Sequence, residues 1–386
     1  MYNIDDLEEI SVRMIANVRD LTPRFTFDSI ANILDNRLIL IKGFRGVGKT
    51  TLMLHLANKF DGLYFSVDHP YVVDKGIYDL TKSFINRGYN LIFIDEIHKF
   101  PNWRQHVKSL YEEYPSLHLI LSGSPPLAFT PDRRHTLIDL NFLTFREFLY
   151  LQHKSYPASY DEWKDRKRSL SYLGRFDLSN FDDYVYYGGL PIYFSSRAVL
   201  EKIYNSIRKS IWEDSLTFSS VKLGDIQAME QILFSLATSY IGELSINSLS
   251  KNLGITKYKA YHLINLLQEM QIVRLILPYG KGYKRIRGSP KMIFSHPSIR
   301  TAICNALNEK PDIGAIREEL SVFSFIARGY NVFTVKGKRK NPDYIIVKNK
   351  KHFIVEIGGD NKTKSQFEGK NGIIITPPQL KVLAMV

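Results

Sequence analysis

The stretch LILIKGFRGVGKTTLMLHLANKF, residues 38–60, sets the architecture of the amino-terminal part of this chain. An apolar run enters a glycine-rich loop, and Leu52, Leu56 and Phe60 then recur at the spacing of one helix face. The segment GFRGVGKT, residues 43–50, fits the pattern G-x-x-x-x-G-K-[ST] between a strand and a helix. These features predict a phosphate-binding loop, and a lysine-bearing loop with chance glycines is the weaker alternative.

Each residue type in this loop suits a phosphate. Glycines let backbone N–H groups close around phosphate oxygens, and the helix N-terminus adds partial positive charge. Lys49 is expected to reach the β- and γ-phosphates, and the Thr50 hydroxyl to ligate Mg²⁺. We therefore predict ATP and Mg²⁺ as cofactors, with the nucleotide held by Gly43, Phe44, Arg45, Gly46, Val47, Gly48, Lys49, Thr50 and Thr51.

Two acids follow a second apolar strand in LIFIDE, residues 91–96. In a nucleotide site Asp95 would hold the Mg²⁺ shell, and Glu96 would orient and polarise the attacking water. The next apolar run, residues 117–121, ends in Ser122-Gly-Ser124, where a polar side chain can sense the γ-phosphate. Ser122 is the first choice, with a structural turn as the alternative. The predicted catalytic set is Glu96, Lys49 and Ser122.

Four segments carry a resemblance to a known family: LILIKGFRGVGKT, LIFIDEIHKFPNW, LILSGSP and LTFREF. They resemble a widespread prokaryotic family of AAA+-like ATPases of largely uncharacterised function. In its members a winged helix and a region similar to PD-(D/E)xK nucleases follow the ATPase core. The resemblance implies an ASCE-type parallel sheet with Glu96 as the hydrolytic base. It also suggests Arg133 or Arg134 as a finger or sensor, with a surface salt bridge as the alternative.

Composition and charge indicate the class of partner and the cellular compartment. The 386 residues carry 52 Lys and Arg against 39 Asp and Glu, a net charge of +13 that favours a polyanionic partner. The single cysteine, Cys304, excludes an internal disulfide, and no Cys/His cluster has zinc spacing. Because no apolar run reaches transmembrane length and the acidic amino terminus lacks a signal sequence, we predict a cytoplasmic protein with no membrane contact.

Residues 225–300 show a helix-turn-helix pattern. A short helix ends at Gly254, Thr256 is the expected N-cap, and a second helix runs from Lys257 to about residue 270. The basic segment PYGKGYKRIRG, residues 278–288, is a plausible wing. Contact with nucleic acid, DNA in the first place, would come from Lys257, Lys259, Lys281, Lys284, Arg285 and Arg287. A contact between domains is the alternative.

The last segment orders as helix (315–329), strands (332–335, 344–347, 352–357), a helix and a strand (372–376), the core order of the PD-(D/E)xK fold. A hairpin turn at Asn349–Lys350 would put Asp343 opposite Glu356. With Glu318 on the leading helix, these acids are candidate ligands for a divalent cation.

The position of the motif lysine is occupied by Gly358, two residues beyond the second acid. Cleavage would need a substitute such as Lys362 or Lys364. A catalytically silent module that binds nucleic acid or another partner is the alternative.

The predicted fold class is α/β, with a P-loop parallel sheet and helical lid followed by a winged-helix domain and an α+β PD-(D/E)xK-like domain. The predicted domains are residues 1–150 (ATPase), 151–225 (lid and connector), 226–300 (winged helix) and 301–386 (nuclease-like). The predicted function is an ATP-hydrolysing AAA+-type ATPase coupled to an impaired nuclease-like module that acts on or near DNA. The alternatives are a nucleotide-switched signalling ATPase with a protein partner and an ATP-gated metal-dependent nuclease. The sequence leaves the oligomeric state open.

Overall fold

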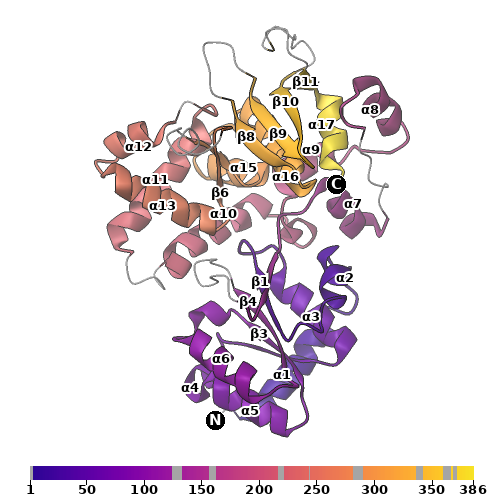
Figure 1. Ribbon diagram of the computed structural model, residues 1–386, viewed down its shortest axis with the longest axis vertical. Coiled ribbons are helices and arrows are strands. Elements are labelled where there is room, and N and C mark those ends of the chain that lie inside the picture. Colours follow the sequence, from indigo (N-terminus) through magenta and orange to yellow (C-terminus); the bar gives the residue numbers. More distant parts are fainter. Residues whose placement is uncertain are drawn as a thin grey trace. The chain divides into compact units, whose positions relative to one another are not determined.

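The computed structural model describes residues 3–123, 133–155, 162–215, 221–242, 244–280, 290–335, 342–359, 367 and 372–386. The chain divides into two compact units, residues 1–141 and residues 142–386, here called the first and the second unit (Figure 1). The first unit holds the predicted phosphate loop. The finer division of residues 151–386 into three domains stays a prediction.

The first unit is built on a five-stranded sheet in the order β2-β3-β4-β1-β5. Every neighbouring pair in this sheet is parallel. The strands are β1 (Leu38–Lys42), β2 (Leu63–Ser66), β3 (Leu91–Asp95), β4 (His118–Gly123) and β5 (Thr136–Asp139). The helices are α1 (Ile4–Ala16), α2 (Thr26–Ala31), α3 (Lys49–Phe60), α4 (Pro70–Lys75), α5 (Ile77–Asn86) and α6 (Trp103–Glu113), with the 3-10 turn η1 (Ile97–Lys99). The predicted parallel sheet is confirmed.

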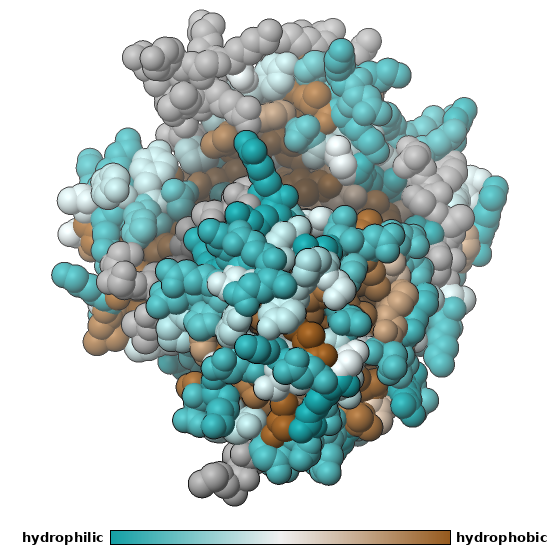
Figure 2. All heavy atoms as spheres, turned by 60° about the horizontal axis from the view of Figure 1, so that its bottom comes forward, coloured by the Kyte–Doolittle hydropathy of each residue, from teal (hydrophilic) through white to brown (hydrophobic). Residues whose placement is uncertain are grey.

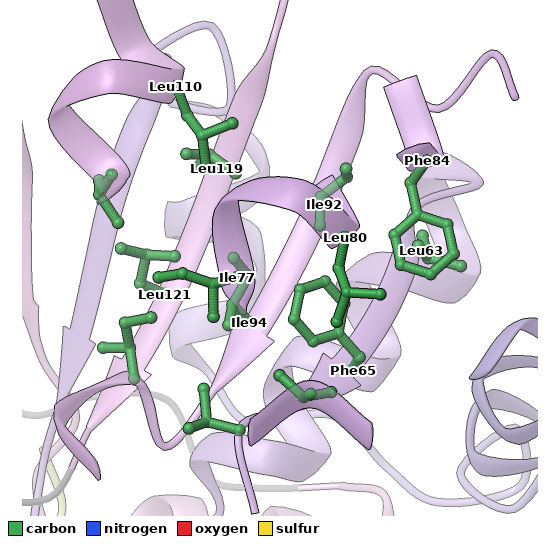
Figure 3. Packing of buried hydrophobic residues seen from close by; sticks show 14 of the residues in the cluster. Leu63, Phe65, Ile77, Leu80, Phe84, Ile92, Ile94, Leu110, Leu119 and Leu121 are labelled. Carbon is green, nitrogen blue, oxygen red and sulfur yellow. The ribbon is translucent and has the colours of Figure 1, made fainter. Parts of the chain in front are cut away.

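A core cluster of the first unit is formed by apolar side chains that lie on one side of the strands. Residues two apart on a strand point to the same side of the sheet. Ile92 and Ile94 of β3 therefore lie beside Leu119 and Leu121 of β4, and α5 and α6 cover this face (Figure 3). The helical periodicity appears in α5, where Ile77, Leu80 and Phe84 recur at helical spacing and all are buried. This packing fixes the sheet whose carboxyl-terminal edge carries the phosphate loop.

The second unit begins with helices and turns. They are α7 (Phe145–His153), α8 (Arg166–Leu173), α9 (Phe181–Tyr187), η3 (Pro191–Phe194), α10 (Val199–Lys209) and the π-helical turn η4 (Ser210–Asp214). Next come α11 (Leu223–Thr238), α12 (Ile246–Asn252) and α13 (Lys257–Glu269). Thr256 accepts a hydrogen bond from the backbone N–H of Lys259, as expected of an N-cap, and Gly254 has a φ of 63°. The helix, turn and helix thus lie where the sequence pattern predicts them.

Within its described residues, the rest of the second unit has a hairpin, three helices and a four-stranded sheet. The hairpin consists of β6 (Val273–Ile276) and β7 (Lys291–Phe294). The helices are α15 (Pro297–Ala306), α16 (Ile313–Ala327) and α17 (Pro377–Ala384). The sheet has the order β11-β10-β9-β8, from β8 (Asn331–Thr334), β9 (Tyr344–Lys348), β10 (Lys351–Ile357) and β11 (Gly372–Ile375). The helix predicted before β11 falls mostly outside the described residues.

The register of the β9–β10 hairpin agrees with the sequence prediction. Val347 pairs with His352, and Asn349 and Lys350 both have positive φ, 51° and 64°. A two-residue turn of this kind matches the twist of the flanking strands. The register continues to Tyr344 opposite Val355, so Asp343 and Glu356 come together at the end of the ladder.

The β6–β7 hairpin and the four-stranded sheet share hydrogen bonds and a core. Beyond β6, the chain pairs with the edge strand β8: Tyr279 N donates to Thr334 O at 2.9 Å, and Thr334 N donates to Leu277 O at 3.0 Å. Buried residues from both parts form one cluster: Ile276, Ile293, Val322 and Tyr344. The hairpin is therefore fixed against α16 and β9, which becomes important for the acidic residues there.

The surface combines hydrophilic and hydrophobic residues. On the face drawn in Figure 2 hydrophilic residues predominate, with hydrophobic residues showing between them. Among the described residues no helix is both long and apolar enough to span a bilayer. Cys304 is buried as a free thiol.

Candidate functional site

The phosphate loop connects β1 to α3 and needs its glycines. Gly46 and Gly48 have φ of 94° and 96°, a left-handed conformation that side chains with a Cβ avoid. A Cβ on Gly43 would lie 2.5 Å from Leu140 O and 2.9 Å from Val47 Cγ2, which leaves no room for it. Phe44 and Val47 are buried and anchor the loop from inside. The backbone thus follows a path that the sequence pattern requires.

Two buried cations hold the loop through its carbonyl groups. Lys49 Nζ donates to Gly43 O at 2.9 Å and to Phe44 O at 3.3 Å. Arg24, which precedes α2, donates to Val47 O at 2.5 Å and to Asn141 O at 3.0 Å. The sequence prediction included Lys49 but missed Arg24, because a single arginine in a connecting segment carries no pattern.

Asp95 accepts hydrogen bonds from several elements of the first unit. Its Oδ2 accepts hydrogen bonds from Thr50 Oγ1 at 2.6 Å and from the Tyr64 hydroxyl at 2.9 Å. Its Oδ1 accepts from Ser122 Oγ and from the backbone N–H of Glu96. Ser122 can reach Asp95 because β4 lies between β1 and β3 in the sheet. The predicted residues Thr50, Asp95 and Ser122 therefore share one site, whereas Ser124 lies outside the described residues.

Tyr64 of β2 is a further member of this site that the sequence reasoning missed. It is buried, and burial followed by the Asp95 charge raises the pKa of its phenol far above the usual range. The hydroxyl is therefore protonated at neutral pH and acts as the donor to Asp95. Tyrosine in a strand usually indicates packing, so the sequence pattern gave no signal of this role.

Glu96 follows directly after β3 with a φ of 53°, a left-handed backbone conformation that ends the strand. Its Oε2 lies 3.5 Å from Nδ1 of His98, a buried residue. Burial raises the pKa of Glu96, and the nearby Lys49 ammonium opposes this effect. A carboxylate with raised proton affinity beside the loop has the chemistry of a general base.

The residues present fit a nucleotide with Mg²⁺. The Thr50 hydroxyl and the Asp95 carboxylate are the two oxygen groups that would hold the metal, and they already lie within hydrogen-bonding distance. Lys49 is a buried ammonium within the loop. Bound Mg²⁺ would supply neutralisation of phosphate charge.

The acids of the second unit form a separate cluster. Ile357 N donates to Asp343 Oδ2 at 2.7 Å, and Asp343 N donates to Glu356 Oε2 at 3.2 Å. Glu318 of α16 accepts from Lys291 Nζ at 2.6 Å and from the Tyr344 hydroxyl at 2.5 Å. Burial and the Glu318 charge raise the pKa of Asp343 to about 6. The structure brings the three predicted acids together and adds Lys291, which the sequence reasoning did not consider.

With Lys291 bonded to Glu318, this cluster presents no open set of oxygens to a divalent metal ion. Among the described residues, no group of three or more His, Cys, Asp or Glu side chains is arranged to hold a metal. A cation of that kind needs several converging oxygens, whereas these carboxylates bond to backbone N–H groups, a phenol and an ammonium. Lys362 and Lys364 lie outside the described residues.

The predicted nucleic-acid contacts fall into three groups. Lys257 is exposed at the start of α13. Lys259 Nζ forms an ion pair with Asp225 Oδ1 at 2.7 Å. Lys281, Lys284, Arg285 and Arg287 lie outside the described residues.

The two arginines suggested as a finger or sensor lie at the surface of the first unit. Arg134 forms an exposed ion pair with Glu112 at 3.4 Å, and Arg133 is exposed. The ion pair of Arg134 agrees with the alternative of a surface salt bridge.

Comparisons with known proteins find two family models. Residues 35–149 match a model described as an AAA domain. Residues 178–310 match a model described as a domain of unknown function (DUF8612). An uncharacterized protein of Methanocaldococcus jannaschii is 26% identical over 89% of this chain and 81% of its own length.

Two solved structures overlap the chain at low similarity. One is a signal transduction ATPase with numerous domains (STAND) with a tetratricopeptide repeat sensor, from Pyrococcus horikoshii, at 11% identity and a TM-score of 0.29. The match covers 80% of this chain and 46% of that protein, so this chain spans less than half of its length. The other is a RuvB variant from Thermotoga maritima, at 14% identity, covering 80% of this chain and 95% of RuvB with a TM-score of 0.32. The AAA model match together with the loop geometry indicates an AAA-type P-loop ATPase-like domain.

Proposed function

We propose that this protein is an ATP- and Mg²⁺-dependent ATPase of the cytoplasm whose second unit contacts nucleic acid, DNA in the first place. In this proposal residues 226–300 act as a winged helix and residues 301–386 as an impaired PD-(D/E)xK-like module. The observation that carries the ATPase is the shared site of Lys49, Thr50 and Asp95, with Glu96 beside it.

The side chains have distinct tasks in hydrolysis. The Lys49 ammonium meets the charge on the β- and γ-phosphates, which requires it to leave its present bonds to the loop carbonyls. Thr50 and Asp95 would hold the metal, and Tyr64 and Ser122 orient Asp95. Glu96 accepts the proton of the attacking water, a task that its raised pKa favours.

A pair of variants separates binding from turnover. Lys49→Ala should lose ATP binding, because the charge that meets the phosphates is gone, and Glu96→Gln should bind ATP but not hydrolyse it. Binding is measured by calorimetry and turnover by phosphate release. Equal turnover in wild type and Glu96→Gln would contradict the assignment of the base.

Support for a polyanionic partner comes from charge and exposure. The chain carries a net charge of +13. At the start of α13, Lys257 is exposed next to Tyr258, a residue that is 85% exposed. An exposed aromatic beside a cation at the N-terminus of the second helix suits contact with a nucleic acid. Lys259 contributes less in this arrangement, since Asp225 already neutralises it.

A salt titration of DNA binding tests this part of the proposal. Replacing Lys281, Lys284, Arg285 and Arg287 by alanine should weaken binding to all sequences and reduce the salt slope by roughly 0.9 for each phosphate that the variant no longer neutralises. Lys257→Ala should act in the same direction. The control for Lys257→Ala is Lys351→Ala, which removes the same charge at an exposed lysine of β10. An unchanged slope in the fourfold variant would favour a protein partner instead.

A further inference from the structure

We propose that Lys291 is the resident cation of the acid cluster in the second unit, and that it takes the place that a divalent metal would need. The cluster consists of Glu318, Asp343 and Glu356. Its positive partner comes from β7, a strand that precedes the nuclease-like segment in the chain. The inference goes beyond the ATPase assignment and uses none of the nucleotide-binding residues.

The direction of Lys291 follows from the alternation of β7. Side chains two apart on a strand face the same side, and Ile293 belongs to the buried cluster with Val322 and Tyr344. Lys291 therefore points toward the same neighbours. Its Nζ lies 2.6 Å from Glu318 Oε1 and 4.6 Å from the centre of the Tyr344 ring. Its side chain is 18% exposed, so most of its stem is packed.

The spacing of residues along α16 places Glu318 where it can pair with Lys291. Glu318, Val322 and Ile326 recur every four residues and form one stripe of α16. Val322 and Ile326 pack against the hairpin and β9 in the shared hydrophobic cluster, so Glu318 continues that stripe toward Lys291. The adjacent Glu319 points elsewhere and pairs with Arg300. The Lys291–Glu318 contact is thus set by two packed elements rather than by two long side chains meeting at a surface.

Every acid of the cluster already has a partner within the protein. Glu318 has the Lys291 ammonium and the Tyr344 hydroxyl, Asp343 has the Ile357 N–H, and Glu356 has the Asp343 N–H. A divalent ion at these oxygens would have to displace the ammonium, because two cations sharing Glu318 repel each other. The lysine that the nuclease motif expects on β10 is absent, since Gly358 holds that position. The ammonium of Lys291 therefore compensates the charge of Glu318, and we infer that it competes with a metal ion at that acid.

Calorimetric titration of the metal-free full-length protein with Mn²⁺, without nucleotide, tests this inference. Wild type and Asp343→Asn should bind the same amount of Mn²⁺, because the cluster of the wild type binds none. Lys291→Met removes the ammonium but keeps the packed stem, and should gain one Mn²⁺ per chain at an affinity at least about tenfold above any wild-type binding at the cluster. This added Mn²⁺ binding should disappear in the double variant Lys291→Met/Asp343→Asn. Lys291→Gln provides a second charge removal that keeps a donor for Glu318, in case the methionine variant folds poorly.

Lys351→Met is the control for these variants, because it removes an exposed lysine of β10 and should leave Mn²⁺ binding unchanged. Asp343-dependent Mn²⁺ binding in wild type, or no gain in either Lys291 variant, would overturn the inference. Cleavage of linear DNA by wild type in Mn²⁺ that disappears in both Lys291→Met and Asp343→Asn would overturn it too and would make Lys291 a catalytic lysine. Because these readouts need no ATP, a failure of the ATPase assignment is detected separately by the Lys49 and Glu96 variants.

Discussion

Asp95 illustrates how one carboxylate depends on donors that are distant in the sequence. Thr50, Tyr64 and Ser122 come from α3, β2 and β4, and all three donate to it. The motif predicted Thr50 and Asp95 as metal ligands, but an acid at the end of a strand can adopt several rotamers. The Tyr64 and Ser122 donors restrict Asp95 to the orientation seen here, which is the usual task of groups behind a metal ligand.

Removal of the Tyr64 hydroxyl should therefore weaken the use of Mg²⁺. Tyr64→Phe keeps the buried ring and is expected to raise the Mg²⁺ concentration needed for ATP hydrolysis by about tenfold or more. The measurement is the hydrolysis rate against Mg²⁺ at saturating ATP. Tyr78→Phe is the control, because the Tyr78 hydroxyl bonds to the exposed Glu113 on the surface. Equal Mg²⁺ dependence in Tyr64→Phe and wild type would show that the hydroxyl does not position Asp95.

Asp343 gives a pH dependence with a definite sign. Its pKa is about 6 in the folded protein against an ordinary 3.8. A raised acid pKa stabilises the fold fully below about pH 4, and this contribution is lost as the pH rises through 6. Asp343→Asn has no such loss. Its stability relative to wild type should therefore improve by about 2 kcal/mol between pH 4 and pH 8, as measured by urea unfolding at both values.

Asp177 supplies a control of the opposite sign. The backbone N–H of Ser179 donates to its carboxylate and lowers its pKa. Wild type therefore gains stability from Asp177 as the pH rises. The free energy of unfolding of Asp177→Asn, relative to wild type, should be lower at pH 8 than at pH 4. A pH-independent difference for Asp343→Asn would mean that the carboxyl is not perturbed by its surroundings.

The phosphate loop shows how an element constrains its residues. Gly43 has no space for a Cβ, because Leu140 O and Val47 Cγ2 lie at 2.5 and 2.9 Å from its position. Gly43→Ala should push the loop off β1, lower the free energy of unfolding by about 1–3 kcal/mol and weaken ATP binding. Chemical denaturation and calorimetry measure these two effects.

Gly224 offers a matched control for this substitution. It lies in the first turn of α11, and a Cβ there would meet no atom within 4 Å. Gly224→Ala should therefore leave the stability unchanged or raise it by up to about 1 kcal/mol, as alanine favours helices. An equal cost for both variants would contradict the steric account of Gly43.

The second unit contains a buried ion pair that no local pattern indicates. Arg300 and Glu319 are fully buried and pair at 2.8 Å, and Arg300 also donates to Leu236 O and Ala237 O near the end of α11. Helices α11, α15 and α16 thus meet at one guanidinium. Burial raises the pKa of Glu319, and the Arg300 charge opposes this change. Such a pair specifies an arrangement more than it adds net stability.

Breaking the pair from one side should be costly. Arg300→Met leaves a buried carboxylate without its cation and is expected to lower the free energy of unfolding by about 3–5 kcal/mol. Arg300→Met/Glu319→Leu should be less destabilised than the single variant, because no charge is left behind. Arg208→Met, at an ion pair in which the arginine is exposed and Glu230 keeps a second donor in Trp212, should cost at most about 1 kcal/mol. Similar costs for Arg300→Met and Arg208→Met in urea unfolding would refute this account.

The features that could be predicted from the sequence are local ones. The loop over residues 43–50, Thr256 as an N-cap and the Asn349–Lys350 turn each depend on backbone conformations that short segments impose on themselves. The parallel sheet was implied by the family resemblance rather than by any one segment. The two-residue turn then fixed the register of the β9–β10 hairpin, and this register brought Asp343 next to Glu356.

The partners of the charged groups were decided by the tertiary structure. Arg24 on the loop, Tyr64 on Asp95, Lys291 on Glu318 and Arg300 on Glu319 are separated from their partners by 19 residues or more. The sequence pattern does not report such pairs, because a buried charge is satisfied by whichever donor or acceptor the packed elements bring within about 3 Å. A motif can therefore identify an acid cluster, while the cation that pairs with one of its acids depends on how the β6–β7 hairpin packs against α16.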